Sequence, residues 1–429
     1  MLAKLNYHPE VIRFRRIASR YRRSKTNKKA FLRWKEKYEK AVRNVEESKW
    51  NEERVKQGLD GLRKKLRKIR GLTPLALSSV KHTCFNDLSK SAGYNKGKAK
   101  IKADISLDEC QEVLDRLVEG DLCHEYVSRV GFRSHIVEHD APDKARVILV
   151  TAGPIVFVEK IFAYPFQLAM MNHSETVWGT GWTWDRHGGQ ILQHQFPNGA
   201  VSLDFKSFDL CAPNWLKAEI FSVIGESFEL TEREQRLLDS ISQLHQTGTA
   251  TYGMYRIPLT HGVRTGSAFT HVIGTLLSIF LMEYCGVENY KCYGDDVIAE
   301  ADLGYLRTVI FSTSYAIHPD KSCSGLHWLG LKLVQERWHI QDVDRRIASM
   351  MLPEPGKRKL DLATRMQGHI LNGGRDPIVE RWISILEETG NDAITPELRE
   401  EVHRWGRTYN DCPFLTIREF HSYLTAEFA

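Results

Sequence analysis

Acidic side chains that could bind metal ions stand in two separate stretches of this sequence. Asp204 ends the apolar string VSLD, and Asp295 and Asp296 follow Gly294 in the string YGDD. A glycine at the first central position of a two-residue hairpin favours a type II′ turn, which holds Asp295 at the tip. If the two stretches form neighbouring strands, three carboxylates converge and repel one another unless cations lie between them.

Divalent cations are the expected partners of such a cluster. Carboxylate oxygens suit Mg²⁺, with Mn²⁺ as an alternative. Two ions about 3.5–4 Å apart can activate a hydroxyl and stabilise a leaving oxygen in phosphoryl transfer. Asp204 and Asp295 are the first candidates for metal ligands. Asp296 is a weaker candidate, because neighbouring side chains on a strand point to opposite faces. A lone Gly-Asp-Asp string is also typical of a solvated turn, so the surrounding elements decide between the two interpretations.

The elements that must position these carboxylates are mixed rather than regularly alternating. Helical spacing is found over 12–70, 106–130, 231–246 and 268–285, and from about residues 214 and 357 onwards. Strand patterns are found at 146–158 (a strand, a turn and the start of a helix through 170), 198–209, 291–300, 328–334 and 336–341. This irregular order favours an α+β fold over a doubly wound sheet.

The composition fits a folded, soluble protein in a reducing compartment. The chain has 429 residues, of which 42% are hydrophobic, enough for a large core. Its longest apolar run, 272–282, is shorter than the ~20 residues of a membrane span, and the first residues lack the apolar core of a signal peptide. The eight cysteines include no C-x-x-C pair, which argues against structural zinc or a disulfide scaffold. We expect no membrane partner.

Positive charge is concentrated at the N-terminus. Residues 1–70 hold 24 Lys and Arg against 8 Asp and Glu, so the remaining chain has 36 against 46, although the net charge is only +6. Trp34, Tyr38 and Trp50 are interleaved with these basic residues. Such a segment could bind RNA or an acidic protein surface. The alternative is a long solvated helix, because residues 31–57 have helical spacing with alternating charge.

Taken in order, the strings around the carboxylates resemble the motifs of viral RNA-dependent RNA polymerases. SLDFKSFD is similar to motif A, with Asp204 and, five residues later, Asp209. YGDD is similar to the motif C turn. GVRTGSAFTHVIG is similar to motif B, which in that family contacts the template and the incoming ribose, here through Gly266, Ser267 and Thr270.

Four shorter strings extend the resemblance over residues 90–355. HPDKS is similar to motif D, whose lysine, here Lys321, is expected to protonate the departing pyrophosphate. HWLGLKL is similar to the motif E strand. DKARVILV resembles motif F, where Lys144 and Arg146 share one face of a strand and would face the triphosphate. KSAGY is similar to motif G on the template path, with template-binding residues Ser91, Gly93 and Tyr94.

The resemblance implies a right-hand fold of fingers, palm and thumb with an antiparallel palm sheet backed by helices. We expect a basic helical segment over 1–70, fingers over 71–195, a palm with a fingers insert over 196–335 and a mostly helical thumb over 336–429. It also implies catalytic roles for Asp204, Asp295, Asp296 and Lys321, with Mg²⁺, an RNA template and product, and ribonucleoside triphosphates.

Small size and the string MLPEPG make the chain most similar to partitivirus and picobirnavirus polymerases of segmented double-stranded RNA viruses. That likeness implies a location in the virion interior and host cytoplasm, and a viral capsid protein as a partner of the basic N-terminus. The chain departs from the usual pattern at Gly274, where many such enzymes have an asparagine that contributes to ribose recognition.

Two alternatives remain open from the sequence. A reverse transcriptase shares the Y-x-D-D turn, but usually places an aromatic ring at the position of Asp209. A non-catalytic, capsid-associated RNA-binding protein could also have the basic N-terminus, although intact carboxylates at 204 and 295 count against it.

Overall fold

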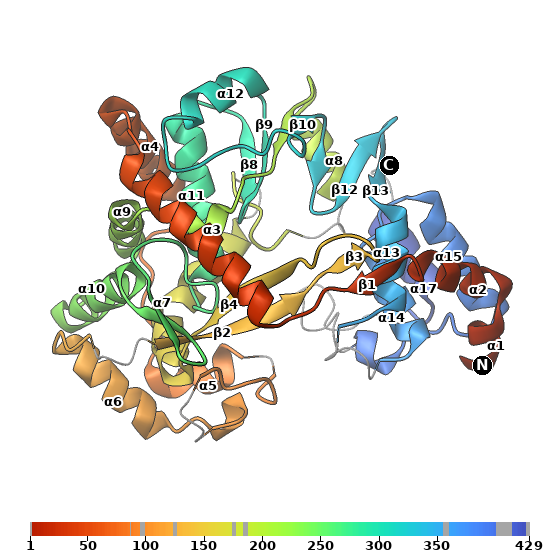
Figure 1. Ribbon diagram of the computed structural model, residues 1–429, viewed down its shortest axis with the longest axis horizontal. Coiled ribbons are helices and arrows are strands. Elements are labelled where there is room, and N and C mark those ends of the chain that lie inside the picture. Colours follow the sequence, from red (N-terminus) through yellow and green to blue (C-terminus); the bar gives the residue numbers. More distant parts are fainter. Residues whose placement is uncertain are drawn as a thin grey trace.

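The computed structural model describes residues 2–85, 87–94, 99–122, 127–173, 177–182, 188–354, 360–399 and 414–425. Within these ranges, helices surround four small sheets whose strand pairs are antiparallel in all but one case (Figure 1). The structure is therefore of the α+β class that the sequence predicts.

The carboxylate stretches lie in a four-stranded antiparallel sheet with the order β10-β5-β9-β8. Its strands are β5 (Val201–Leu203), β8 (Tyr290–Tyr293), β9 (Asp296–Ala299) and β10 (Cys323–Ser324). Helix α11 (Thr270–Tyr284) packs against β8, with α9 (Asn214–Gly225) beside it. Because α11 is apolar on nearly every side, it is buried almost throughout, as the run 268–285 predicts.

A second sheet has the order β4-β2-β6-β7 and holds the residues of the expected fingers. Its strands are β2 (Val127–Ser134), β4 (Ala145–Val150), β6 (Thr249–Tyr252) and β7 (Tyr255–Pro258). The helix predicted over 106–130 is wrong in its second half. Helix α6 (Leu107–Val118) ends just before Gly120, whose φ of 78° suits a helix terminus, and burial alternates along β2.

Helix α7 (Gly153–Asn172) follows β4 and carries eleven buried residues. It is the one helix in the described part of the chain that is long and apolar enough to span a membrane by those criteria, and 56% of its most apolar window is buried inside the protein. The buried set includes one carboxylate, Glu159. Other helices of this half are α5 (Leu77–Thr83), α8 (Gly188–Gln195), α10 (Glu232–Gln246), α12 (Leu303–Ile310) and the short 3₁₀ helices η1 (Lys102–Asp104) and η2 (Phe208–Leu210).

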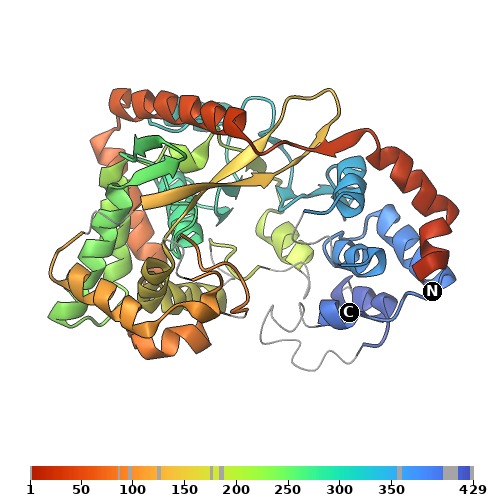
Figure 2. The ribbon, with the colours of Figure 1, turned by 60° about the horizontal axis from the view of Figure 1, so that its bottom comes forward.

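The basic N-terminal residues form several elements rather than one long helix. They are α1 (Leu2–Tyr7), α2 (Pro9–Ala18), β1 (Tyr21–Arg23), α3 (Lys28–Glu47) and α4 (Glu52–Leu66). The first two helices pack on the C-terminal helices, β1 pairs with β3 (Ile136–Glu138), and α3 and α4 lie at the opposite side of the molecule (Figures 1 and 2). This segment therefore crosses the whole protein.

The helix predicted through 31–57 is interrupted between α3 and α4. Asn51 caps α4 by accepting the backbone N–H of Arg54, and Trp50 turns inward against Trp215 and Phe280. Helix α4 then packs closely on α11: a Cβ at Gly58 would lie 2.7 Å from the Phe280 ring. The N-terminal segment is therefore partly integral to the core and not a detached solvated arm.

The C-terminal part has its own apolar core beside a three-stranded antiparallel sheet. Its elements are β11 (His327–Trp328), β12 (Leu331–Val334), β13 (Arg337–Ile340), α13 (Val343–Met351), α14 (Leu362–Leu371), α15 (Pro377–Glu388) and α17 (Ile417–Thr425). The single strand predicted over 328–334 is a hairpin, because Leu329 and Gly330 both adopt positive φ. The helices expected beyond 357 are present in the described residues.

Candidate active site

The three metal-ligand candidates meet at one end of the β5-β9-β8 sheet. Leu203 pairs with Val297 and Tyr293 with Asp296, so the register places Asp204 beside the hairpin turn. Partial burial, followed by repulsion from Asp295 and Asp204, raises the pKa of Asp296 to about 7. The register therefore brings the three carboxylates to the same end of the sheet, and their role as metal ligands stays a prediction.

The turn between β8 and β9 has the expected form. Gly294 has a φ of 60°, whereas Asp295 is not among the described non-glycine residues with positive φ, which fits a type II′ turn. Both Asp295 and Asp296 present surface to solvent, although the protein atoms around the Asp296 carboxylate partly desolvate it. No group of three acidic, His or Cys side chains in the described ranges already stands at metal-ligand spacing, so these carboxylates would have to turn towards a shared ion.

Two hydroxyls of α11 hold this turn, and sequence reasoning missed both. Thr275 Oγ1 accepts the backbone N–H of Gly294 at 2.9 Å, and Ser278 Oγ donates to the Gly294 carbonyl at 2.6 Å. Both side chains are fully buried. The signal was available, since they are spaced three apart in an otherwise apolar helix, where a buried hydroxyl needs a partner.

The segment after α12 holds Asp204 from the other side. The backbone N–H of His318 donates to the Asp204 carbonyl at 2.7 Å, and Ser322 Oγ accepts the Asp204 N–H at 2.9 Å. Lys321 Nζ lies 3.5 Å from Asp204 Oδ1, with half of its side chain exposed. The expected general acid therefore reaches the carboxylates but is not locked in place.

The phosphate-binding candidates also face this site. Lys144 and Arg146 are exposed, whereas Val147 and Leu149 are buried, as alternation along β4 predicts. Partial burial and the charges of Lys321 and Arg345 lower the pKa of Lys144, and the charge of Asp204 opposes this shift. Lys144 is thus close enough to sense the charges of two other site residues.

Asp209 lies in η2, next to the carboxylates and to β4. Burial raises its pKa, the charge of Arg146 opposes that shift, and the charge of Asp295 adds to it. Thr270 Oγ1 is 2.7 Å from both the Arg264 and the Ser267 carbonyl oxygens. Its hydroxyl hydrogen is therefore engaged with the backbone.

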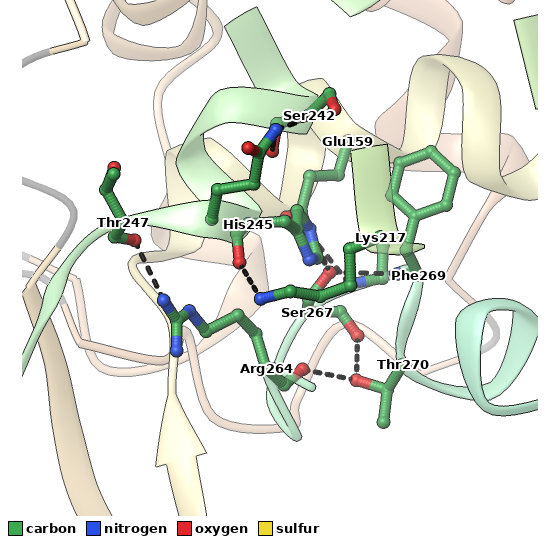
Figure 3. Close-up of polar contacts among 11 residues, drawn as sticks. Glu159, Lys217, Ser242, His245, Thr247, Arg264, Ser267, Phe269 and Thr270 are labelled. Atoms are coloured by element: carbon green, nitrogen blue, oxygen red, sulfur yellow. Dashed lines mark hydrogen bonds and ion pairs between the residues drawn. The ribbon is translucent and has the colours of Figure 1, made fainter. Parts of the chain in front are cut away.

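Ser267 differs from the prediction that its side chain faces the nucleotide. Its hydroxyl donates to Glu159 Oε2 at 2.9 Å, inside the protein (Figure 3). Ser267 is only 9% exposed and Glu159 has no exposed surface. The serine is therefore not available to replace the missing motif B asparagine in this conformation. At that position, a Cβ on Gly274 would lie 3.6 Å from Gly294 Cα, an ordinary contact.

Three loops meet at the C-terminal end of β4. A Cβ at Gly266 would lie 2.1 Å from the Leu149 carbonyl oxygen, and one at Gly93 would lie 2.4 Å from that of Thr151. Only glycine allows both approaches. The Tyr94 N–H also donates to the Thr151 carbonyl. The expected template-binding string around Gly93 is therefore docked beside the motif B-like loop.

The remaining template-binding candidate, Ser91, forms an isolated bridge with Ile101. Its hydroxyl accepts the Gly93 N–H at 3.2 Å. These contacts shape the string around Gly93 and leave its interaction with a template as a prediction.

Comparisons with known proteins agree with this geometry. Residues 2–304 match the family model described as "Viral RNA-dependent RNA polymerase". A curated relative, the RNA-directed RNA polymerase of Cryptosporidium parvum virus 1 (strain KSU-1), is 25% identical over 129 residues. The match covers 28% of this chain and 22% of that relative, so this chain spans less than a quarter of its length.

Solved structures show the same fold at low sequence identity. The insertion-loop deletion mutant of the RNA-dependent RNA polymerase of a human picobirnavirus has a TM-score of 0.66 and 13% identity, covering 96% of this chain and 87% of that chain. The Sicinivirus 3Dpol RNA-dependent RNA polymerase has a TM-score of 0.64 and 15% identity, covering 83% and 86%. The right-hand fold and the likeness to picobirnavirus polymerases are confirmed at the level of architecture.

Proposed function

This chain belongs to the viral RNA-dependent RNA polymerase family, and on that premise we propose that it synthesises RNA on an RNA template. The family implies an RNA template, ribonucleoside triphosphates and dependence on divalent metal ions. The observation that carries the proposal is the register of β5 with β9, which brings Asp204 to the Asp295-Asp296 turn.

Asp204, Asp295 and Asp296 are the residues that would hold the metal ions, and we propose Mg²⁺, with Mn²⁺ as a substitute. Their oxygen donors suit both ions, and a bound cation would oppose the desolvation and repulsion that raise the pKa of Asp296. When bound, such ions would activate the attacking hydroxyl and neutralise charge on the leaving oxygen.

The reaction we propose is attack of a primer 3′-hydroxyl on the α-phosphorus of a ribonucleoside triphosphate, with release of pyrophosphate. Lys144 and Arg146, exposed on β4, would bind the phosphates. Lys321 would give its proton to the leaving pyrophosphate, since its amine stands beside Asp204. Asp209 would sense the ribose 2′-hydroxyl. Gly266 would contact the nucleotide, and Ser91, Gly93 and Tyr94 would contact the template.

Primer extension on a homopolymer RNA tests this proposal. We expect incorporation of ribonucleotides that requires Mg²⁺ or Mn²⁺, and far weaker incorporation of deoxyribonucleotides. A preference for deoxyribonucleotides would instead indicate a reverse transcriptase. Absence of incorporation under both conditions, with RNA binding retained, would favour a non-catalytic RNA-binding protein.

The basic N-terminal segment supports a second part of the proposal, that the enzyme binds RNA or an acidic capsid protein and works in the virion interior and host cytoplasm. Arg33, Lys37 and Lys40 are exposed and share one face of α3 by their spacing. The charge of Lys37 also opposes the rise in the pKa of Asp209 that burial causes, which places this face near the active site.

Because α4 is part of the core, substitution is a better test of this face than deletion. If Arg33, Lys37 and Lys40 contact RNA phosphates, changing all three to Gln should reduce the salt slope of RNA binding by about 2. An unchanged slope, together with lost binding to capsid protein, would favour the protein partner.

A further inference from the structure

A buried carboxylate holds the motif B-like loop, residues 263–270, from inside the protein. Glu159 Oε2 accepts the Ala268 N–H at 2.7 Å and the Ser267 hydroxyl at 2.9 Å, and Oε1 lies 3.0 Å from His245 Nε2 (Figure 3). Glu159 and His245 have no exposed surface. Burying a carboxylate is costly unless donors surround it, and here three donors from two elements converge on one side chain.

With Glu159 ionised, its two oxygens only accept, so His245 donates from Nε2 and the Ser267 hydroxyl donates to Oε2. Ser267 Oγ in turn accepts the Phe269 N–H at 2.9 Å. One carboxylate on α7 thereby fixes three consecutive residues of the loop, 267–269.

Two buried basic side chains hold the chain that leads into this loop. Lys217 Nζ donates to the Gly262 carbonyl at 2.8 Å, and the Arg264 guanidinium donates to the carbonyls of Thr247 and Leu259 at 2.9 and 3.0 Å. Both side chains are fully buried. The loop is thus fixed at its entry as well as at its end.

The opposite face of the loop touches the strand that carries the phosphate-binding candidates. Thr265 Oγ1 accepts the Leu149 N–H at 3.0 Å, and Gly266 lies against the Leu149 carbonyl. Lys144 and Arg146 precede this contact on the same strand. A shift of residues 267–269 therefore changes how the loop meets β4.

We propose that Glu159 is a positioning residue for nucleotide incorporation, acting through Ser267 and the Ala268 amide to set the loop against β4. This inference rests on the proposed polymerase function. Glu159 touches no substrate, because it has no exposed surface. The lone carboxylate in the apolar string PIVFVEKIF therefore serves a site formed more than 100 residues later.

The test compares three variants with a control. The variants are Glu159→Gln, Ser267→Ala and the double variant that combines these two changes, and the control is Ser240→Ala. A glutamine at this position has one acceptor oxygen and an NH₂ group with two donor hydrogens. The surrounding protein presents three donors, so at least one of them loses its acceptor. Ser240 is a matched control, because its buried hydroxyl donates to the Leu117 carbonyl on α6 and is not bonded to the loop. Single-turnover incorporation is normalised to active enzyme, and hydrogen exchange is followed in peptides covering 263–270.

We expect Glu159→Gln and Ser267→Ala each to lower kcat/KM for the nucleotide by about ten- to a hundredfold. The double variant should be little worse than either, because the residues act in one network. Both should speed amide exchange in 263–270, whereas Ser240→Ala should change neither measurement.

Two results would overturn the inference. One is a Glu159→Gln enzyme that is less heat-stable but has wild-type kcat/KM in its active fraction, which would reduce Glu159 to a fold-stabilising role. The other is unchanged exchange in 263–270. Hydrogen exchange needs no activity, so it tests whether Glu159 holds the loop even if the wild-type chain fails to incorporate nucleotides. That failure would count against the proposed function alone.

Discussion

The carboxylates at the hairpin turn of Gly294 and the carboxylate beneath the loop 263–270 differ in exposure and in hydrogen bonding. At the turn, Asp295 and Asp296 are exposed, and Asp204 has a half-exposed lysine at 3.5 Å as its ion-pair partner. Beneath the loop, Glu159, His245 and Ser267 form a buried cluster, the loop cage. In it Glu159 has no exposed surface and accepts three hydrogen bonds. Groups that must exchange partners during a reaction keep few internal partners, whereas groups that hold position are fully bonded.

This difference has an energetic side. Exposed ion pairs contribute about 0–1 kcal/mol, so little stability is lost when the Lys321 amine leaves Asp204. Removing one partner of a buried charged network costs about 3–5 kcal/mol. Substitutions at the turn should therefore affect activity far more than folding, and substitutions in the loop cage should affect both.

The largest effect is expected for Asp295→Asn. An amide is a poor ligand for a hard cation, so single-turnover incorporation should fall about 10³-fold or more, equivalent to several kcal/mol of lost stabilisation. The melting temperature should stay close to wild type because the side chain is exposed. Glu300→Gln, which removes an exposed carboxylate just after β9, is the matched control and should retain activity. Unchanged incorporation by folded Asp295→Asn would remove this residue from the metal site.

Lys321→Leu should have the next largest effect. Loss of a positioned proton donor slows the chemical step by about 10²–10⁴-fold, while nucleotide affinity stays close to wild type. Rapid-quench measurement of single-turnover rates against nucleotide concentration separates the two quantities. Lys321→Arg keeps the charge but is a poor acid, so a wild-type rate in this variant would show that Lys321 acts through charge alone.

A smaller effect is expected for sugar selection at Asp209. Because Ser267 is bonded to Glu159 and Gly274 offers no side chain, we expect Asp209 to be the main polar group that recognises the 2′-hydroxyl. Asp209→Ala should narrow the ratio of kcat/KM for GTP over dGTP by about one to two orders of magnitude. An unchanged ratio would identify another sugar sensor.

Much of the turn was predictable from the sequence because its chemistry is local. Gly294 fixes the turn type, and the carboxylates follow it directly in the chain. The alternation of Arg146 with Val147 and Leu149 likewise predicts which face of β4 is buried. These features need only short-range geometry, and the structure confirms them.

The loop cage was not predictable because its partners are distant in the chain. Glu159 and Ser267 are separated by 108 residues, and no spacing rule joins them. The N-terminal segment shows the same limit: its helical pattern was visible, but its packing on α11, as in the close approach of Gly58 to Phe280, was not. The strand β2 was not predicted, because the helical spacing just before it continued into its first residues and its alternation of apolar and polar residues is short.

The smallest effect is expected on thermal stability, when one carboxylate in each region is changed to an amide. The two changes should shift the melting temperature in opposite directions. The pKa of Asp296 is raised from 3.8 to about 7, so between these values the folded protein binds more protons at this residue than the unfolded chain. The free energy of unfolding therefore falls as pH rises through this range. In metal-free buffer at pH 8, Asp296→Asn should remove the desolvation cost of this charge and its repulsion by Asp295 and Asp204, so the variant should melt higher than wild type.

The gain should be small, about 1 kcal/mol or less, because solvent reaches the Asp296 side chain and screens the repulsion. It should shrink as pH falls through 7 and vanish below about 4, where aspartate is protonated in both states. Glu159→Gln should melt lower than wild type under the same conditions, because its donors lose an acceptor inside the protein. Melting curves of both variants from pH 4 to 8 test the contrast. Shifts of the same sign would show that the turn is not under electrostatic strain, and that its exposed carboxylates are as well satisfied as the buried one.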